Sequence, residues 1–149
     1  MENRESGNKG TLQFYFLRVY VKEIYGTLDN PQYRPLANVT VLVNSSIFCI
    51  IWQFHWSGKT NESGTTGGIY VAPIYFMVTV SKDGYHTYKC KPFKIVFIDV
   101  LPYGYVDVYF TMAENGSPFV KQISQSKQQS NSQGSNPLTS YSFKYYIDC

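Results

Sequence analysis

The sequence predicts an all-β protein, a β-sandwich followed by a tethered C-terminal strand. Between residues 11 and 112, short β-patterned runs alternate with turn signals, and no helical period is visible. The composition agrees, because the 149 residues include 14 Tyr and 10 Phe, and only 15% are charged, against a usual value of about a quarter. A chain of this length is expected to form one domain with a sizeable core.

The first β-patterned run covers residues 12–25 and alternates between two faces. Its apolar face contains Tyr15, Leu17, Val19 and Val21, and its polar face contains Arg18, Tyr20 and Lys22. The start of the run breaks this alternation, because three large apolar side chains fall on the polar face: Leu12, Phe14 and Phe16. We therefore expect these three residues to offer a docking surface for the C-terminal tail, of the same chain or of a neighbour.

A loop, two strands and a connection are expected next. Gly26, Pro31 and Pro35 mark residues 26–37 as a loop, and residues 38–44 alternate as a strand. The run IFCIIWQFHW, residues 47–56, is apolar on both faces, which is typical of a central strand with Trp52 and Trp56 in the core. Residues 57–68 are rich in turn-forming residues and read as a connection.

The last runs of the sandwich are residues 69–80, 92–100 and 103–112, for a total of about seven strands. Asp83-Gly84 supplies the positive φ of a tight turn after the first of them. Tyr85 follows, and we expect its ring to cover the open end of the sandwich with its hydroxyl in water. In the last run Val106 and Val108 are expected to point inward and Asp107 outward.

Three segments, taken in order, resemble a known family. PLANVTVLV, GKTNESG and YFMVTVSKDGYHT are similar to the proline-led strand, the Gly-x-Thr-x-x-x-Gly turn and the Val-Ser-Lys-x-Gly-Tyr strand end of carboxypeptidase regulatory-like domains. The resemblance covers roughly residues 17–112 and implies a seven-stranded Greek-key sandwich of the prealbumin-like (transthyretin-like) type. Its motifs shape the fold and imply no chemistry, since Gly64 and Gly84 fall where chain reversal needs positive φ.

Charge and motifs argue against several classes of function. The net charge of +3 is mild and the 13 Lys and Arg are scattered, so nucleic-acid binding is not expected. No apolar run is long enough for a membrane span, and no signal-peptide core follows Met1. His55 and His86 fall in no metal-binding or general-base spacing and no GxSxG motif is present, so we expect no enzyme, no metal and no cofactor.

The three cysteines, Cys49, Cys90 and Cys149, lie far apart and form no CxxC pair, which argues against a zinc site. Two alternatives stay open. Either Cys49 is a small buried side chain and the other two are incidental thiols, or two of the three form a disulfide and one is left over. Four sequons are candidate glycosylation sites and point to an outer surface: Asn38, Asn44, Asn61 and Asn115.

The end of the chain differs from the sandwich. Residues 115–137 are expected to be a flexible linker, because residues 124–136 are almost entirely Ser, Gln and Asn and would span about 20 Å as a tether. Residues 138–149 then alternate strictly, with an apolar side formed by Tyr141, Phe143, Tyr145 and Ile147. Because an unpaired strand of this kind is an aggregation hazard, we expect it to dock on its own sheet or on a neighbour's.

These observations predict an N-terminal arm (residues 1–10), a β-sandwich (11–114), the linker and a C-terminal docking strand. The expected function is a non-catalytic structural or assembly subunit of a virion or an extracellular surface, with protein partners bound through the C-terminal strand. The richness in Tyr, Asn, Ser and Gln is similar to that of structural proteins of archaeal viruses. The alternative is an accessory module that binds carbohydrate or peptide, with a stacking platform from Trp52, Trp56, Tyr70 and Tyr75. A third hypothesis is a regulatory domain that is separated from its peptidase.

Overall fold

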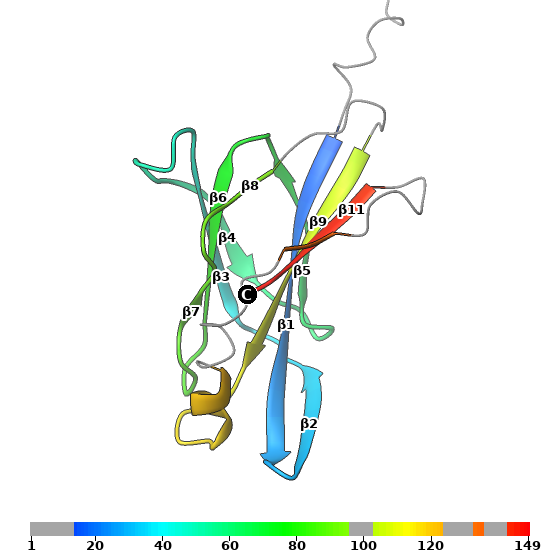
Figure 1. The fold of residues 1–149 in the computed structure, drawn as a ribbon, viewed down its shortest axis with the longest axis vertical. Helices are drawn as coiled ribbons and strands as arrows, with labels where there is room; N and C mark the ends of the chain where they lie inside the picture. The colour runs from blue at the N-terminus through cyan, green and yellow to red at the C-terminus, as the bar shows by residue number, and fades with distance from the viewer. Residues whose placement is uncertain (1–13, 96–102, 124–132, 136–142) are drawn as a thin grey trace, which may run out of the picture.

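The computed structural model of the protein describes residues 14–95, 103–123, 133–135 and 143–149, and these form two β-sheets that face each other (Figure 1). The all-β sandwich expected from the sequence is confirmed. A short helix over residues 119–123 follows the last long strand.

The first sheet has six strands in the order β10-β11-β9-β1-β2, with β5 also paired to β1. Their bounds are β1 (Phe14–Thr27), β2 (Asn30–Pro35), β5 (Thr65–Val71), β9 (Tyr103–Met112), β10 (Gln133–Ser135) and β11 (Phe143–Asp148). One edge of the long β1 pairs with β5 along its first half and with β2 along its second half, and both pairings are antiparallel. The other edge of β1 pairs in parallel with all of β9, from Phe14 opposite Tyr103 to Glu23 opposite Met112.

The second sheet has five strands in the order β4-β3-β6-β7, with β8 also paired to β6. Their bounds are β3 (Thr40–Ser46), β4 (Gln53–Lys59), β6 (Tyr75–Ser81), β7 (Tyr88–Lys89) and β8 (Phe93–Lys94). All of these pairings are antiparallel. Strand β4 therefore lies at an edge of this sheet.

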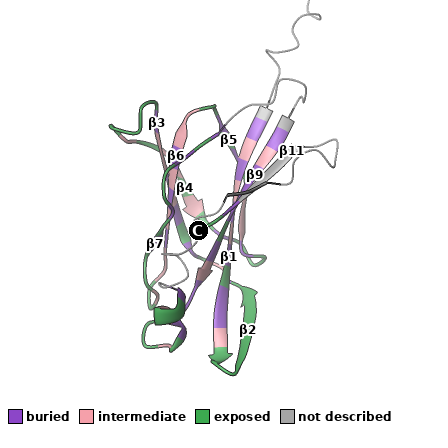
Figure 2. Ribbon diagram, in the orientation of Figure 1, coloured by how far each residue is buried: buried purple, intermediate pink, exposed green. Residues whose placement is uncertain are grey.

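The core lies between the sheets and follows the predicted alternation. Leu17 and Val19 of β1, Val41 and Val43 of β3, and Val108 of β9 are fully buried, at 0% exposure. Figure 2 shows buried residues along β1 and β9, whereas strand β2 at the sheet edge is exposed. The inward faces of the expected strands over residues 12–25, 38–44 and 103–112 are confirmed where the structure describes them.

Two expected segments are divided differently in the structure. Residues 26–37, expected to be a loop, contain strand β2, which tolerates Pro31 and Pro35 because it lies at the sheet edge. Residues 69–80, expected to be one run, are split between β5 of the first sheet and β6 of the second. Pro73 lies at the break, where a residue without a backbone N–H ends the pairing. About seven strands were expected over residues 11–112. The described residues of this range form nine strands, β1 to β9.

The prediction for residues 47–56 is wrong. Only residues from Gln53 onward are in a strand, β4, while residues 47–52 form the loop between β3 and β4. Phe48, Ile50 and Phe54 are 77%, 78% and 67% exposed, and Trp52 and Trp56 are half-buried rather than core residues. A run of apolar residues shows that burial of their side chains would be favourable. It does not show whether the core of the same chain buries them.

The helix over residues 119–123 falls in the expected linker. Phe119 is 1% exposed and Ile123 is 8% exposed, and both belong to the hydrophobic core. The buried part of the sandwich therefore extends beyond Glu114. The predicted arm, Leu12, Tyr141 and residues 124–132 and 136–137 of the linker lie outside the described residues.

Candidate functional site

The C-terminal strand docks on its own chain. Strand β11 pairs in parallel with β9, from Phe143 opposite Gly104 to Asp148 opposite Tyr109, and β10 covers part of its other edge. Ile147 is 8% exposed and joins the core, as the alternation of the tail predicts. The backbone N–H of Cys149 donates a hydrogen bond of 2.8 Å to the carbonyl oxygen of Tyr109, which extends the pairing to the last residue.

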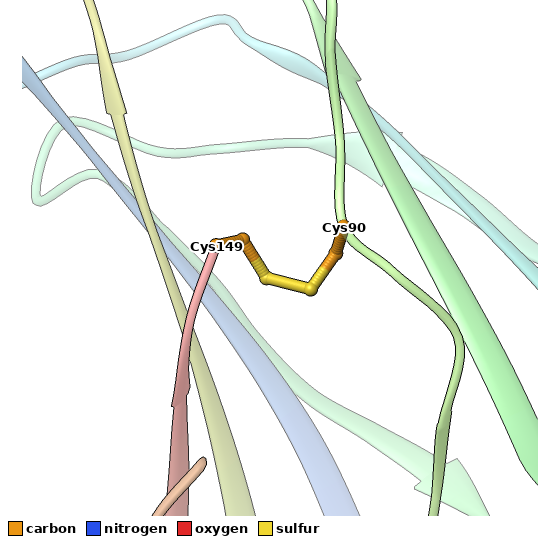
Figure 3. The surroundings of a disulfide bond; sticks show 2 residues. All are labelled: Cys90 and Cys149. Carbon is orange, nitrogen blue, oxygen red and sulfur yellow. A yellow bond between two sulfur atoms is a disulfide. The ribbon is translucent and has the colours of Figure 1, made fainter. Parts of the chain in front are cut away.

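A disulfide between Cys90 and Cys149 fixes this strand to the opposite sheet (Figure 3). Cys90 follows β7 in the second sheet, where its N–H donates to the carbonyl oxygen of Val78 at 2.9 Å. The two Cα atoms are 5.0 Å apart, and the cysteines are separated by 59 positions in the sequence. The bond thus ties the two sheets together at the end of β11. It selects one of the two alternatives that the sequence left open.

Cys49 is the cysteine left over, and it is exposed rather than buried. It lies in the loop between β3 and β4 with a φ of 64°, a backbone conformation that residues other than Gly rarely adopt. The expectation of a buried Cys49 depended on the same mistaken strand over residues 47–56.

The expected docking surface for the tail is not where the tail binds. Strand β9 separates β11 from β1, so Phe16 does not lie beside the tail. The ring of Phe16 instead packs against Tyr70 and Tyr105, with both centroids 6.0 Å away. The backbone of Phe14 pairs with Tyr103 of β9. Phe143 and Tyr145 are placed by their backbone pairing with Gly104 and Val106.

A buried carboxylate lies at the end of the sandwich near Tyr85. Glu23 is 2% exposed, and its Oε1 accepts from Nε of Arg34 at 2.8 Å. Its Oε2 accepts from the hydroxyl of Tyr85 at 2.8 Å. The expectation that this hydroxyl is in water is wrong, because it donates its hydrogen bond to the Glu23 carboxylate. Continued alternation from Val19 and Val21 places residue 23 inward, and this signal could have identified Glu23.

A second buried carboxylate lies on the outer side of the first sheet. Asp107 is 1% exposed, although its face of β9 was expected to point outward into solvent. Nε and Nη2 of Arg18 donate to its two oxygens at 2.7 and 2.9 Å. The Arg18 guanidinium lies 4.0 Å from the ring centroid of Tyr105, so aromatic side chains cover the pair. The pairing of β1 with β9, which brings these residues together, has no local sequence signal.

The histidines have ordinary structural surroundings. Nε2 of His55 is 2.9 Å from the carbonyl oxygen of Tyr70, and its ring packs edge-on against Phe76. The ring of His86 lies 6.5 Å from that of Tyr88. Among the described residues, no three His, Cys, Asp or Glu are grouped closely enough to hold a metal ion.

The candidate glycosylation sites differ in accessibility. Asn38, Asn61 and Asn115 are exposed at turns, and Asn44 is half-buried in the central strand β3. Asn61 shapes its own turn, because its Oδ1 accepts from the N–H groups of Ser63 and Thr65. Use of these sites stays a prediction.

No family model matches the chain, and no curated protein matches it. The resemblance to carboxypeptidase regulatory-like domains therefore stays a prediction. Within the described residues, no helix is long and apolar enough to cross a membrane.

Proposed function

We propose that the protein is a non-catalytic structural subunit of a virion or a cell surface, which assembles with copies of itself or with other structural proteins. The observation that carries this proposal is the closure of the sandwich by its own C-terminal strand and the Cys90–Cys149 disulfide. Disulfides form and persist in oxidising surroundings, which supports a site of action on an outer surface. The two buried carboxylates, Glu23 and Asp107, are bound in ion pairs that hold strands together.

The C-terminal strand is also the element best suited to join subunits. Exchange of an identical element between copies is a low-cost route to assembly, because the exchanged strand makes the same contacts in either arrangement. The predicted tether before β11 would span about 20 Å, which is of the order of a strand length. In the exchanged form, β11 of one copy pairs with β9 of a neighbour, and Cys149 bonds to the neighbour's Cys90.

The disulfide gives a direct test of this arrangement. In a Cys49→Ser background, the protein is purified without reductant and run on non-reducing and reducing gels, with its mass in solution measured by light scattering. We expect disulfide-linked oligomers that collapse to single chains on reduction and that are absent from a Cys49→Ser/Cys149→Ser control. A monomer at every concentration, with peptide mapping that finds Cys90 and Cys149 joined in one chain, would rule out assembly through the tail.

A ligand-binding accessory module is the second candidate. The observation in its favour is the set of aromatic rings on the outer side of the first sheet, where Tyr70 is 59% exposed beside Phe16 and the ring of Tyr109 stacks on that of Tyr20. Such rings can stack on sugar faces, whereas Trp52, Trp56 and Tyr75 of the expected platform are half-buried. Binding to a glycan array that Tyr70→Ala abolishes would favour this function, and no binding would remove it.

A further inference from the structure

The loop between β3 and β4 presents the largest group of exposed apolar side chains among the described residues. Ile47, Phe48, Ile50 and Ile51 are 66–78% exposed, and Phe54 at the start of β4 is 67% exposed. We call these five residues the apolar tip. The loop projects from the side of the second sheet, at upper left in Figure 1, and Figure 2 shows it as exposed. Contiguous apolar surface of this kind marks an interaction site.

The apolar tip does not fold back onto the body of the protein. With Ile74, four of its side chains border an open apolar hollow of about 390 Å³. Four apolar side chains in this loop of six residues stay largely exposed, so the rest of the protein does not bury them. A fluid hydrocarbon medium can surround such a projecting loop, whereas a rigid partner would need a matching socket.

Among the described strands of the second sheet, Lys94 is the charged residue whose pairing lies nearest the apolar tip. Residues 35–58 contain no Asp, Glu, Lys or Arg. The five strands of the second sheet contain no acidic residue, and their charged residues are Lys59, Lys89 and Lys94. Lys94 lies at the base of the apolar tip, because it pairs with Tyr75, which in turn pairs with Ser46 at the end of β3.

The base of the apolar tip also carries amphipathic aromatic residues. Trp52 and Tyr75 are half-buried there, and Nζ of Lys94 lies 5.6 Å from the ring centroid of Tyr75. Trp and Tyr are enriched where a protein crosses from hydrocarbon to water, and Lys near that boundary is attracted to anionic headgroups. The order from apolar residues to aromatic rings to a lysine matches the layers of a bilayer surface.

We propose that the apolar tip inserts into the outer layer of an anionic lipid bilayer, with Lys94 beside the lipid phosphates. The five side chains of the apolar tip supply the inserted surface, and Trp52 and Tyr75 lie at the headgroup level. Binding of this kind does not require exchange of β11, so it holds whether or not the tail joins subunits.

Co-sedimentation with vesicles of phosphatidylcholine, with and without phosphatidylserine, tests the proposal. We expect the protein to bind the vesicles that contain phosphatidylserine. Ile50→Asp should weaken this binding by at least about tenfold, because it removes one inserted apolar side chain and adds a charge. Leu28→Asp is the matched control, since Leu28 is 58% exposed in the turn between β1 and β2 and should not contribute. Equal binding by the two variants, or no binding by the unaltered protein, would overturn the proposal.

The role of Lys94 has its own comparison. Lys94→Glu should weaken binding to the phosphatidylserine vesicles by about fivefold. Lys59→Glu is the control, because Lys59 pairs with Thr40 at the far end of β4 and should leave binding nearly unchanged. Equal losses from both would show that only net charge matters and would contradict a contact at Lys94.

Cys49 allows insertion to be observed directly. It is free while Cys90 and Cys149 are bonded, so a thiol-reactive, polarity-sensitive dye attaches at the apolar tip alone. We expect the emission of the dye to shift to the blue and to rise when vesicles with phosphatidylserine are added. If Ile50→Asp instead lowers the mass of an oligomer and vesicles leave the dye unchanged, the apolar tip joins protein subunits and the membrane proposal is wrong. Equal unfolding curves for all variants check that each is folded.

Discussion

The hydroxyl of Tyr85 donates a hydrogen bond of 2.8 Å to Oε2 of Glu23, a carboxylate that is 2% exposed. Arg34 binds the other oxygen of the carboxylate from strand β2, so the three side chains connect β1, β2 and the turn after β6. Tyr85 also bridges by its backbone to Glu114. The turn is therefore anchored to both sheets at this end of the sandwich.

Loss of the Tyr85 hydroxyl should destabilise the protein. In Tyr85→Phe the buried Glu23 keeps Arg34 but loses its second partner, and an unsatisfied buried group of this kind costs about 1–3 kcal/mol. Urea unfolding of the variant measures the change in the free energy of unfolding. Tyr33→Phe is the control, because Tyr33 is 54% exposed and its hydroxyl should contribute little. Equal unfolding curves for the two variants would show that the bond to Glu23 contributes nothing net.

Stability should also fall at alkaline pH. Burial, with the hydrogen bond to Glu23 as a further cause, raises the pKa of Tyr85 from 10.0 to about 12. The folded protein then holds a proton that the unfolded chain loses, so this contribution is complete below pH 10 and is lost as pH rises through about 12. We expect the free energy of unfolding to decrease over that window, and less steeply in Tyr85→Phe. A remaining decrease is expected, because burial also raises the pKa of Tyr88. The same slope in both proteins would contradict the role of Tyr85.

The ion pair between Arg18 and Asp107 should behave as a buried pair. Removal of Arg18 leaves a carboxylate that is 1% exposed without its cation, and such a loss costs about 3 kcal/mol. Arg18→Met should therefore lower the free energy of unfolding by about that amount, while Arg18→Met/Asp107→Leu should recover much of it. A double-mutant cycle by chemical unfolding measures the coupling. Additive losses in the double variant would contradict a direct interaction.

The parts of the fold that local pattern specifies were predictable. Alternation placed Leu17, Val19 and Val108 in the core, and turn chemistry gave the positive φ of Gly64 and Gly84. The parallel pairing of β1 with β9 was not predictable, because its partners are far apart in the sequence. The ion pair of Arg18 and Asp107 depends on this pairing and was therefore not predictable either.

The candidate sites were predictable only in part. The alternation of the tail correctly buried Ile147, but nothing in the sequence chose Cys90 over Cys49 as the partner of Cys149. At the exposed apolar tip the sequence predicts a core strand, because a central strand and an apolar loop share the same continuous run of large apolar residues.

Gly64 should tolerate a side chain much less well than Gly84. Both have positive φ, which costs an Ala roughly 1–2 kcal/mol. A Cβ on Gly64 would also lie 2.5 Å from the carbonyl oxygen of Val21, whereas a Cβ on Gly84 would meet nothing within 4 Å. Gly64→Ala should therefore lower the midpoint of thermal unfolding clearly more than Gly84→Ala. Equal midpoints would mean that β1 can shift away from residue 64 at no cost.

The disulfide should contribute more to stability than any single contact described above. It closes a loop between residues 59 positions apart, for which the loss of entropy in the unfolded chain corresponds to roughly 4 kcal/mol. Cys149→Ser should lower the free energy of unfolding by about this amount and should make the unfolding curve insensitive to reductant. Cys49→Ser should change neither property, because Cys49 is exposed and unbonded. If Cys149→Ser is as stable as the unaltered protein, the pairing of β11 with β9 is sufficient to close the sandwich without the covalent bond.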